Sequence, residues 1–526
     1  MIARRECVRW VAVLLVVLLL AGLVGCTGRD AHERRASEVN KFSRRFEAAL
    51  EKQGFEVNEG YVQLWGVEDC PNSLPVLGGC DFNNPTAPYL FPAVPYWPDE
   101  FVDPGLVGAF GETRPGYGTT FRLDPNEAIV LLGYLPPEAA YLGIQSYLFT
   151  RKGDYQTDNE TYEYHVSFGS KDLFFHKMPL SPERIGSWDS LSDSTNNVVI
   201  ERQSGSVWEQ FRYLIVTADQ QTETQVRQVL GKLSVAEKDI FTQPIPSNVR
   251  IGLDKDADDF LTLIRYSMPA DGGGPGTASD TWRHDPSLAV LRIRFKGADR
   301  SAQRYPAWDE DSPEPRTGVS EAYLQSDLAG LVHKVAETWG QPCQADDCSG
   351  RALTFVDAQS EPFNLLGPKC IKIGMDCLGD TQDASYKFTY APGFDNGEVY
   401  AVVGTLGTET GNATYVSLAL NNTRLRLGAK NVDHNKLAGS ATPGFYPGVN
   451  NLDKLYVYYF TRNCEGLEEL THGFCMSVED TEFVIPRGTN ASFVEREYIK
   501  VGTQRGPDSA LTLPSVLLIL RGSGQQ

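Results

Sequence analysis

A run of acidic residues in the middle of the chain, Asp254-Lys255-Asp256-Ala257-Asp258-Asp259, has the composition of a cation site. The carboxylates of Asp254, Asp256 and Asp258 recur at alternate positions, so they can wrap around one ion. Carboxylate oxygens are the ligands that Ca²⁺ prefers in proteins. The spacing therefore predicts Asp254, Asp256 and Asp258 as candidate metal ligands, with Ca²⁺ as the metal.

The residues that follow this run argue for a different role. The run resembles the opening of an EF-hand loop, but Asp259 occupies position six, where a glycine makes the turn. Arg265 occupies position twelve, where a glutamate should bind the ion. We favour the alternative that the carboxylates cap a helix predicted over 260–266, because negative charge is stabilised at a helix N-terminus. No cofactor other than Ca²⁺ is expected.

Tyr96 and Trp97 lie in a proline-rich segment, 84–98, that cannot form a helix because proline recurs every few residues. Their rings could bind a ligand, since aromatic faces contact sugars and peptides in many binding sites. Alternatively, the rings fix this irregular segment onto the protein's own core, which we favour. Tyr96 and Trp97 are thus the candidate ligand-binding residues, and a carbohydrate or a protein is the candidate ligand.

Recognisable catalytic motifs are absent from the sequence. None of the seven histidines has a partner at metal-ligand spacing, and there is no His-Glu-x-x-His motif. The sequence contains neither a Gly-x-Ser-x-Gly nucleophile motif nor a Walker-type phosphate loop. A pair of catalytic carboxylates could exist among the 68 acidic residues, but the sequence does not locate it.

The first 26 residues resemble the export signal of bacterial lipoproteins. Arg4, Arg5 and Arg9 precede an uncharged segment, 10–25, which is short for a membrane span and fits a signal peptide. The segment ends in Leu23-Val24-Gly25-Cys26, which is similar to a lipobox. The resemblance implies cleavage before Cys26 and a diacylglyceryl thioether on its sulfur, usually with an acylated amine. An uncleaved N-terminal anchor is the alternative.

The same resemblance predicts an extracytoplasmic, lipid-anchored protein whose partner is the membrane. Thr27 follows the cysteine, where an aspartate would favour the inner membrane of a diderm host. We therefore expect the outer membrane in a diderm host and the cell surface in a monoderm host. Nucleic acid is not an expected partner, because the 526-residue chain has a formal net charge of −20.

The other cysteines agree with export. Besides Cys7 and Cys26, eight remain, in four sequence-local pairs. An oxidising compartment would close these short loops as disulfides. The alternative is a zinc site built from the four cysteines of 343–377, although their spacing is wider than that of a zinc knuckle. The predicted pairs are Cys70–Cys80, Cys343–Cys348, Cys370–Cys377 and Cys464–Cys475.

Hydrophobic periodicity predicts the elements that would position these residues. Helices are expected over 31–53, 222–230, 260–266 and 320–339. Strands are expected over 127–134, 141–150, 213–217, 249–253, 291–295, 455–460 and 515–520. Two further strands, 399–405 and 414–420, flank a polar loop and are expected to form a hairpin.

The predicted fold class is α+β with two domains, β-rich with strand–helix alternation in the first and mainly antiparallel strands in the second. The composition of the glycine-rich segment 271–280 predicts a linker between the two domains. The alternative is a long loop inside one domain. The expected division is a signal peptide (1–25), a lipid anchor and amphipathic stalk helix (26–54), an N-terminal domain (55–270), the linker, and a C-terminal domain (281–526).

Two functions fit these features. The first is an envelope protein of unknown specific role that binds a ligand or partner, or is structural. The alternative is a secreted hydrolase that acts on envelope or environmental polymers through carboxylates that the sequence does not locate. Whether the protein is an enzyme stays open at this point.

Overall fold

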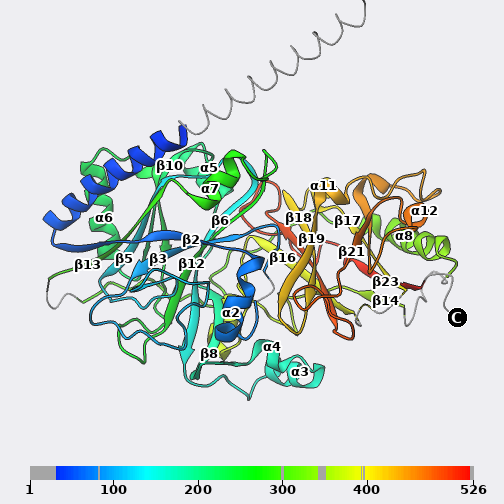
Figure 1. Cartoon of the computed structure of the whole chain (residues 1–526), viewed down its shortest axis with the longest axis horizontal. Helices are drawn as coiled ribbons and strands as arrows, with labels where there is room; N and C mark the ends of the chain where they lie inside the picture. The colour runs from blue at the N-terminus through cyan, green and yellow to red at the C-terminus, as the bar shows by residue number, and fades with distance from the viewer. Residues whose placement is uncertain are drawn as a thin grey trace, which may run out of the picture.

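The computed structural model describes residues 31–80, 83–297, 301–341, 351–391, 394 and 397–521. The predicted leader with Cys26, and the Cys343–Cys348 pair, lie outside these residues. The fold is α+β and multi-domain, with several mostly antiparallel sheets, which confirms the predicted class. Four sheets form two pairs, one from each half of the chain (Figure 1).

Two sheets build the N-terminal half and pack face to face. The first contains, in order, β1 (Phe55–Glu59), β13 (Leu288–Phe295), β5 (Glu127–Tyr134), β10 (Phe211–Thr217) and β11 (Ile240–Pro244). The second contains β2 (Tyr61–Trp65), β3 (Tyr89–Pro95), β12 (Asp259–Pro269), β6 (Ala139–Lys152), β8 (Ser181–Ser190) and β7 (Lys177–Met178). Short β4 (Tyr117–Gly118) pairs with β3, and β9 (Thr195–Asn196) pairs with β6. Apolar side chains of β5 and β10 meet those of β6 and β12 in one core.

Helices cover the outer faces of these two sheets. The amphipathic helix predicted over 31–53 extends over 31–52, and it packs on the first sheet beside α6 (Gln220–Lys232). Val39, Phe46 and Leu50 of this helix are buried, as its three-and-four spacing predicts. The second sheet is covered by α2 (Cys70–Leu77) and by the aromatic segment around Phe110. Among the described residues, no helix combines the length and apolar character that a membrane crossing needs.

The C-terminal half is a sandwich of two further sheets. One contains β14 (Ala352–Thr354), β23 (Val516–Arg521), β17 (Glu398–Thr405), β20 (Leu455–Thr461) and β21 (Cys475–Ser477). The other contains β15 (Val356–Asp357), β16 (Ala384–Ala391), β22 (Ala491–Tyr498), β18 (Tyr415–Asn422) and β19 (Leu427–Asp433). Apolar residues from both sheets fill the space between them, and α8 (Gln325–Thr338) covers the outer face of the first.

Short helices occupy the connections. They are α3 (Glu160–Phe168), α4 (Lys171–Phe174), α5 (Asn197–Ser204), α7 (Ala278–His284), α9 (Gly367–Ile373), α10 (Gly407–Thr410), α11 (His434–Leu437) and α12 (Glu468–Thr471). Three-residue 3₁₀ turns lie at η1 (Val67–Asp69), η2 (Glu237–Asp239), η3 (Ala322–Leu324) and η4 (Leu452–Lys454).

The glycine-rich segment is a loop inside the N-terminal half, so the boundary at 271–280 needs correction. The strand β13 follows it and pairs with both β1 and β5. Asp271 holds the loop by accepting hydrogen bonds from the backbone N–H groups of Gly273 and Ser279. Further on, Trp308 still packs in the N-terminal core, whereas α8 packs on the C-terminal sheet. The chain therefore passes from one half to the other between residues 309 and 324.

Three local predictions were wrong because long-range pairing overrides local pattern. Residues 260–266 form part of β12, which is paired on both sides, so their apolar run reflects a buried strand. Residues 249–253 form no strand, and Gly252 makes one isolated bridge to Leu123. The expected hairpin does not exist, because β17 and β18 lie in different sheets. Between them, α10 redirects the chain, and Thr410 and Asn412 donate hydrogen bonds to the buried carboxylate of Glu321.

An unusual group of charges lies inside the C-terminal sandwich. Both carboxylate oxygens of Glu497 are buried without a hydrogen bond, and Oε2 lies 3.5 Å from Lys387 Nζ. Burial raises the pKa of Glu497 to about 7. The Lys387 ammonium opposes this rise, whereas the carboxylates of Glu495 and Glu321 add to it.

We expect this glutamate to make folding stability depend on pH. The unfolded chain releases the Glu497 proton near pH 4.5 and the folded chain near pH 7, so the free energy of unfolding falls as pH rises between these values. Glu497→Gln should remove a slope worth roughly 1–3 kcal/mol over this range, and it should lower stability at every pH because buried Lys387 loses this carboxylate. Thermal melts from pH 5 to 8 measure this pH dependence of stability, with the exposed Glu469→Gln as control. Equal slopes in the wild type and Glu497→Gln would contradict the expectation.

Candidate functional site

Most carboxylates of the acidic run 254–259 are counter-ions of basic side chains in the structure. Asp256 pairs with Lys152 at 2.5 Å, and Asp258 pairs with Arg151 at 2.7 Å. Asp254 Oδ1 accepts the backbone N–H of Asp256. The helix-cap interpretation also fails, because the strand β12 follows the run. The structure thus directs Asp254, Asp256 and Asp258 to different partners instead of one ion.

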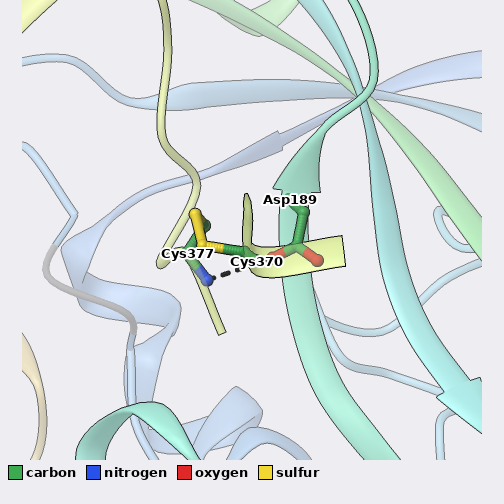
Figure 2. Close-up of side chains that lie close together, drawn as sticks. All are labelled: Asp189, Cys370 and Cys377. Atoms are coloured by element: carbon green, nitrogen blue, oxygen red, sulfur yellow. Dashed lines mark hydrogen bonds between the residues drawn. A yellow bond between two sulfur atoms is a disulfide. The ribbon is translucent and has the colours of Figure 1, made fainter. Parts of the chain in front are cut away.

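Among the described residues, a different set of metal-ligand groups is clustered. Ligand atoms of Asp189, Cys370 and Cys377 lie within 4.8 Å of one another, all buried (Figure 2). The two sulfur atoms are joined in a disulfide, so they are not metal ligands in this state. Disulfides Cys70–Cys80 and Cys464–Cys475 are also formed, which confirms three of the four predicted pairs.

The aromatic pair Tyr96 and Trp97 does not form an exposed ligand surface. Trp97 is only 2% exposed, and its indole N–H donates to Glu127 Oε2 at 2.9 Å. The Arg294 guanidinium lies 4.3 Å from the Trp97 ring centroid. Tyr96 is half-buried, and its pKa rises to about 12, mainly because of burial. Trp97 therefore fixes its segment onto the core, as the favoured alternative predicted.

The structure instead shows a pocket between the two halves of the chain, with a cavity volume of about 90 Å³. Tyr89 of β3 and Arg265 of β12 contribute from the N-terminal half, and the segment 377–380 forms part of the wall. From the C-terminal half, the lining residues are Tyr386, Phe388 and Tyr390 of β16 and Ser492, Val494, Arg496 and Tyr498 of β22.

Strand geometry explains which residues of the C-terminal half form the pocket wall. Side chains two residues apart share one face of a strand, and β16 pairs with β22 so that Tyr386 lies opposite Arg496 and Phe388 opposite Val494. The pocket therefore receives one face of this pair. Its other face carries Lys387 and Glu497, which lie inside the sandwich.

Arg265 is the main positive charge that the N-terminal half contributes. Its side chain is almost fully buried, and its guanidinium donates to Tyr147 Oη at 2.5 Å and to the Gly379 carbonyl at 2.7 Å. The rings of Tyr89 and Tyr147 lie 5.7 and 5.5 Å from it. Among the described residues, no carboxylate lies within ion-pair distance of Arg265. An anion entering the pocket would therefore meet a positive charge without a direct counter-ion.

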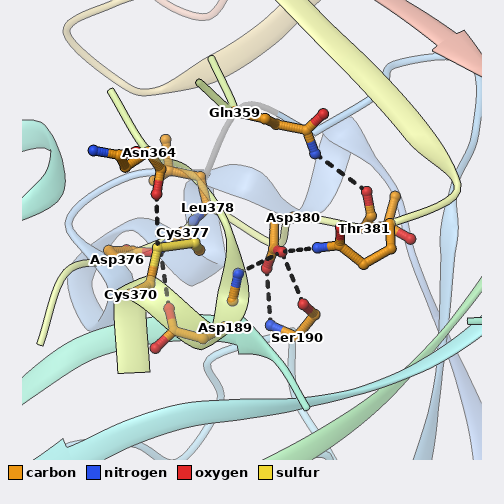
Figure 3. The surroundings of a disulfide bond; sticks show 12 residues. Asp189, Ser190, Gln359, Asn364, Cys370, Asp376, Cys377, Leu378, Asp380 and Thr381 are labelled. Carbon is orange, nitrogen blue, oxygen red and sulfur yellow. Dashed lines mark hydrogen bonds between the residues drawn. A yellow bond between two sulfur atoms is a disulfide. The ribbon is translucent and has the colours of Figure 1, made fainter. Parts of the chain in front are cut away.

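Asp380 is the one acid among the described lining residues, and its oxygens are occupied. Oδ1 accepts the backbone N–H of Ser190, and Oδ2 accepts the Ser190 hydroxyl and the Gly367 N–H, each at 2.8 Å (Figure 3). Gln382 adds a fourth hydrogen bond at 3.1 Å. This carboxylate fixes the pocket wall to β8 and is not presented to a ligand.

Tyr386 and Tyr498 of the pocket act as neutral hydroxyl groups. Burial raises the pKa of Tyr386 and of Tyr498 above the ordinary value. The positive charges of Arg265 and Arg496 oppose this rise in both rings. The pocket thus combines two buried guanidinium groups with aromatic walls, which suits an anionic group attached to an apolar body.

Sequence reasoning did not identify Arg265 or Arg496 as site residues. A signal was present, because Arg265 is the one charged residue in the run 260–269. In β22 the alternation Val494, Arg496, Tyr498 shows a charge on an otherwise apolar face. Neither signal reveals that the two strands, more than two hundred residues apart, face one cavity.

Comparisons with known proteins leave the function open. No family model and no curated protein matches the chain. Among the solved structures that match is that of an uncharacterised protein from Burkholderia cenocepacia, with 11% sequence identity and a TM-score of 0.34. That match covers 96% of this chain and 98% of the other. At this level of similarity it carries no functional argument.

We expect the acidic run to contribute stability and not calcium binding. Asp258→Asn should lower the free energy of unfolding by about 3 kcal/mol, because it leaves the partly buried Arg151 unpaired. Asp256→Asn removes only an exposed pair and should leave unfolding nearly unchanged. Urea titrations with and without Ca²⁺ measure both effects. A Ca²⁺-dependent stabilisation of the wild type that Asp256→Asn abolishes would restore the metal site.

Proposed function

We propose that the protein is an extracytoplasmic, lipid-anchored envelope protein that binds a small anionic ligand with an apolar or aromatic body. The ligand binds in the pocket between the two halves. Arg265 is the observation that carries this proposal: its buried guanidinium lines the pocket and lacks a carboxylate partner among the described residues. A buried charge needs compensation; Tyr147, the Gly379 carbonyl and the more distant Asp380 supply part of it, and an anionic ligand would supply a direct counter-ion.

Ligand size and character follow from the lining. A cavity of about 90 Å³ is smaller than a typical ligand pocket of about 300–1,000 Å³, so it takes the charged end of a small molecule and not a polymer chain. Phe388, Tyr390 and Tyr89 supply apolar and aromatic surface, and Arg496 supplies a second positive charge. This pocket replaces the expected Tyr96–Trp97 surface, and a carboxylate or phosphate ester replaces the carbohydrate or protein ligand.

A binding role is favoured over the hydrolase alternative. Glycosidic hydrolysis needs two carboxyl groups that face one substrate bond. Of the described residues that line the pocket, only Asp380 carries a carboxylate, and four hydrogen bonds hold it. We therefore propose no catalytic residue.

The proposed location rests on two independent features. Sequence features of residues 1–26 imply export and lipid attachment at Cys26. The three disulfides support an oxidising compartment, since cytosolic proteins rarely keep structural disulfides.

Calorimetry with benzoate and octanoate as probes tests the binding proposal. Benzamide and octanamide are the neutral controls of matched shape. We expect the anions to bind and the amides to bind at least about tenfold more weakly, because a charge-assisted hydrogen bond is lost. Arg265→Gln should weaken anion binding at least about tenfold, whereas the exposed Arg424→Gln should not change it. Equal binding of acids and amides, or binding that is insensitive to Arg265, would contradict the proposal.

Mass spectrometry of the chain expressed in a bacterium that processes lipoproteins tests the anchor. The expected N-terminal peptide begins at Cys26 and carries a diacylglyceryl group, and Cys26→Ser should yield an unlipidated chain. A wild-type N-terminus that retains residues 1–25 without lipid would contradict the anchor. The result is independent of ligand binding.

A further inference from the structure

The disulfide Cys370–Cys377 connects α9 to a wall of the pocket. Both cysteines are buried, and Cys377 is itself among the lining residues. The segment that follows Cys377 carries Gly379, whose carbonyl accepts a hydrogen bond from Arg265. The bond therefore constrains backbone that holds the guanidinium of the proposed ligand site.

A buried carboxyl group lies against this disulfide. Asp189 of β8 is fully buried, and a carboxylate oxygen lies within 4.8 Å of both sulfur atoms (Figure 2). Its Oδ1 accepts the backbone N–H of Cys377 at 3.1 Å. Its Oδ2 is buried and makes no hydrogen bond of normal geometry to the described residues; the nearby Ser187 hydroxyl lowers the Asp189 pKa only in part. A polar atom left in this way beside a disulfide calls for a chemical explanation.

The charge state of Asp189 supports a proton-donating role. Burial raises its pKa well above the ordinary value, and the carboxylates of Asp376 and Asp380 add to the rise. The protonated form is therefore favoured, and it carries a hydrogen that a thiolate can accept. A departing cysteine thiolate is a good acceptor because the ordinary pKa of a thiol is about 8.5.

We propose that Cys370–Cys377 is an exchangeable disulfide that reacts through the pocket with an external dithiol, and that Asp189 donates the proton to the leaving sulfur. The geometric basis is that Cys377 lines the pocket and that a carboxylate oxygen of Asp189 lies within 4.8 Å of both sulfur atoms. This inference does not depend on ligand binding in the pocket.

The reaction balances with a dithiol as the reductant. One thiolate of the dithiol attacks Cys377 Sγ, the Sγ–Sγ bond breaks, and Cys370 leaves as a thiolate that takes the Asp189 proton. The second thiolate attacks the sulfur of its own molecule in the mixed disulfide and releases Cys377, which takes a proton from solvent. The protein gains two electrons and two protons, the dithiol becomes a cyclic disulfide, and Asp189 is reprotonated by solvent.

The other disulfides provide internal controls. Cys70–Cys80 is equally buried but, among the described residues, forms no cluster with acidic groups, and it does not line this pocket. Cys464–Cys475 is half-buried, so access alone should make it react first. Burial alone predicts equal protection for Cys70–Cys80 and Cys370–Cys377, whereas the proposal predicts that only the second reacts in the native state.

The test uses the native full chain with dithiothreitol, timed quenching with N-ethylmaleimide, and peptide mass spectrometry. We expect Cys370–Cys377 to be reduced at least about tenfold faster than Cys70–Cys80, under conditions where circular dichroism shows no unfolding. Equal rates for the two buried disulfides, or reduction of Cys370–Cys377 only on unfolding, would overturn the proposal. This comparison needs no variant, so it does not depend on whether a variant folds.

Asp189→Asn tests the role of the carboxyl group. The amide cannot supply an acidic proton, so reduction of Cys370–Cys377 at pH 7 should slow at least about tenfold, and the difference from the wild type should narrow as pH rises. The rate for Cys464–Cys475 should not change. Asp219→Asn, which alters the buried carboxyl that caps α6 in the N-terminal half, is the matched control. An unchanged rate and pH profile in Asp189→Asn would show that Asp189 is not the proton donor.

Discussion

Pairing between buried arginines and carboxylates is the constraint that organises the N-terminal half. Arg292 of β13 is fully buried between Glu100 and Glu127, at 2.7 and 2.5 Å. Asp259 of β12 lies between Arg184 of β8 and Arg122, at 2.7 and 3.2 Å. A buried charge that loses its partner costs several kcal/mol, so each pair fixes the relative position of the strands that carry it. The alignment of both sheets thus depends on ion pairs as well as on apolar packing.

This constraint explains why the chemically suggestive residues of the sequence have structural roles. The acidic run lies beside several arginines, and a carboxylate that neutralises a buried guanidinium has little charge left to attract a cation. Trp97 packs against Arg292 and Arg294 and donates to Glu127, so it belongs to the same network. Composition identified residue types that bind metals or sugars, but the nearest opposite charge determines what they do.

Apolar periodicity in the sequence predicted the helices and strands whose structure depends mainly on residues close in the sequence. The helix 31–52 and the strand β5 lie where apolar periodicity places them, and three of the predicted sequence-local cysteine pairs form. The wrong predictions concern segments whose structure depends on pairing partners that are distant in the sequence. Whether 260–266 is helix or strand depends on its pairing with β3 and β6, and the glycine-rich loop looks like a linker until β13 is placed between β1 and β5. The pocket belongs to this second class, because its residues become neighbours only when the two halves meet.

The interface between the halves therefore decides whether a site exists. Asp380, from the C-terminal side of the chain, is held by Ser190, and Asp383 accepts a hydrogen bond from Tyr141 at 2.9 Å. Asn84 donates to Tyr415 at 3.0 Å. Each contact is a directional bond between polar groups, which specifies how the halves fit but adds little net free energy. An anion that bridges Arg265 and Arg496 would add charge-assisted bonds across the same interface, so ligand binding and docking of the halves should stabilise each other. Because the Cys370–Cys377 disulfide fixes backbone at this interface, its redox state would act on both.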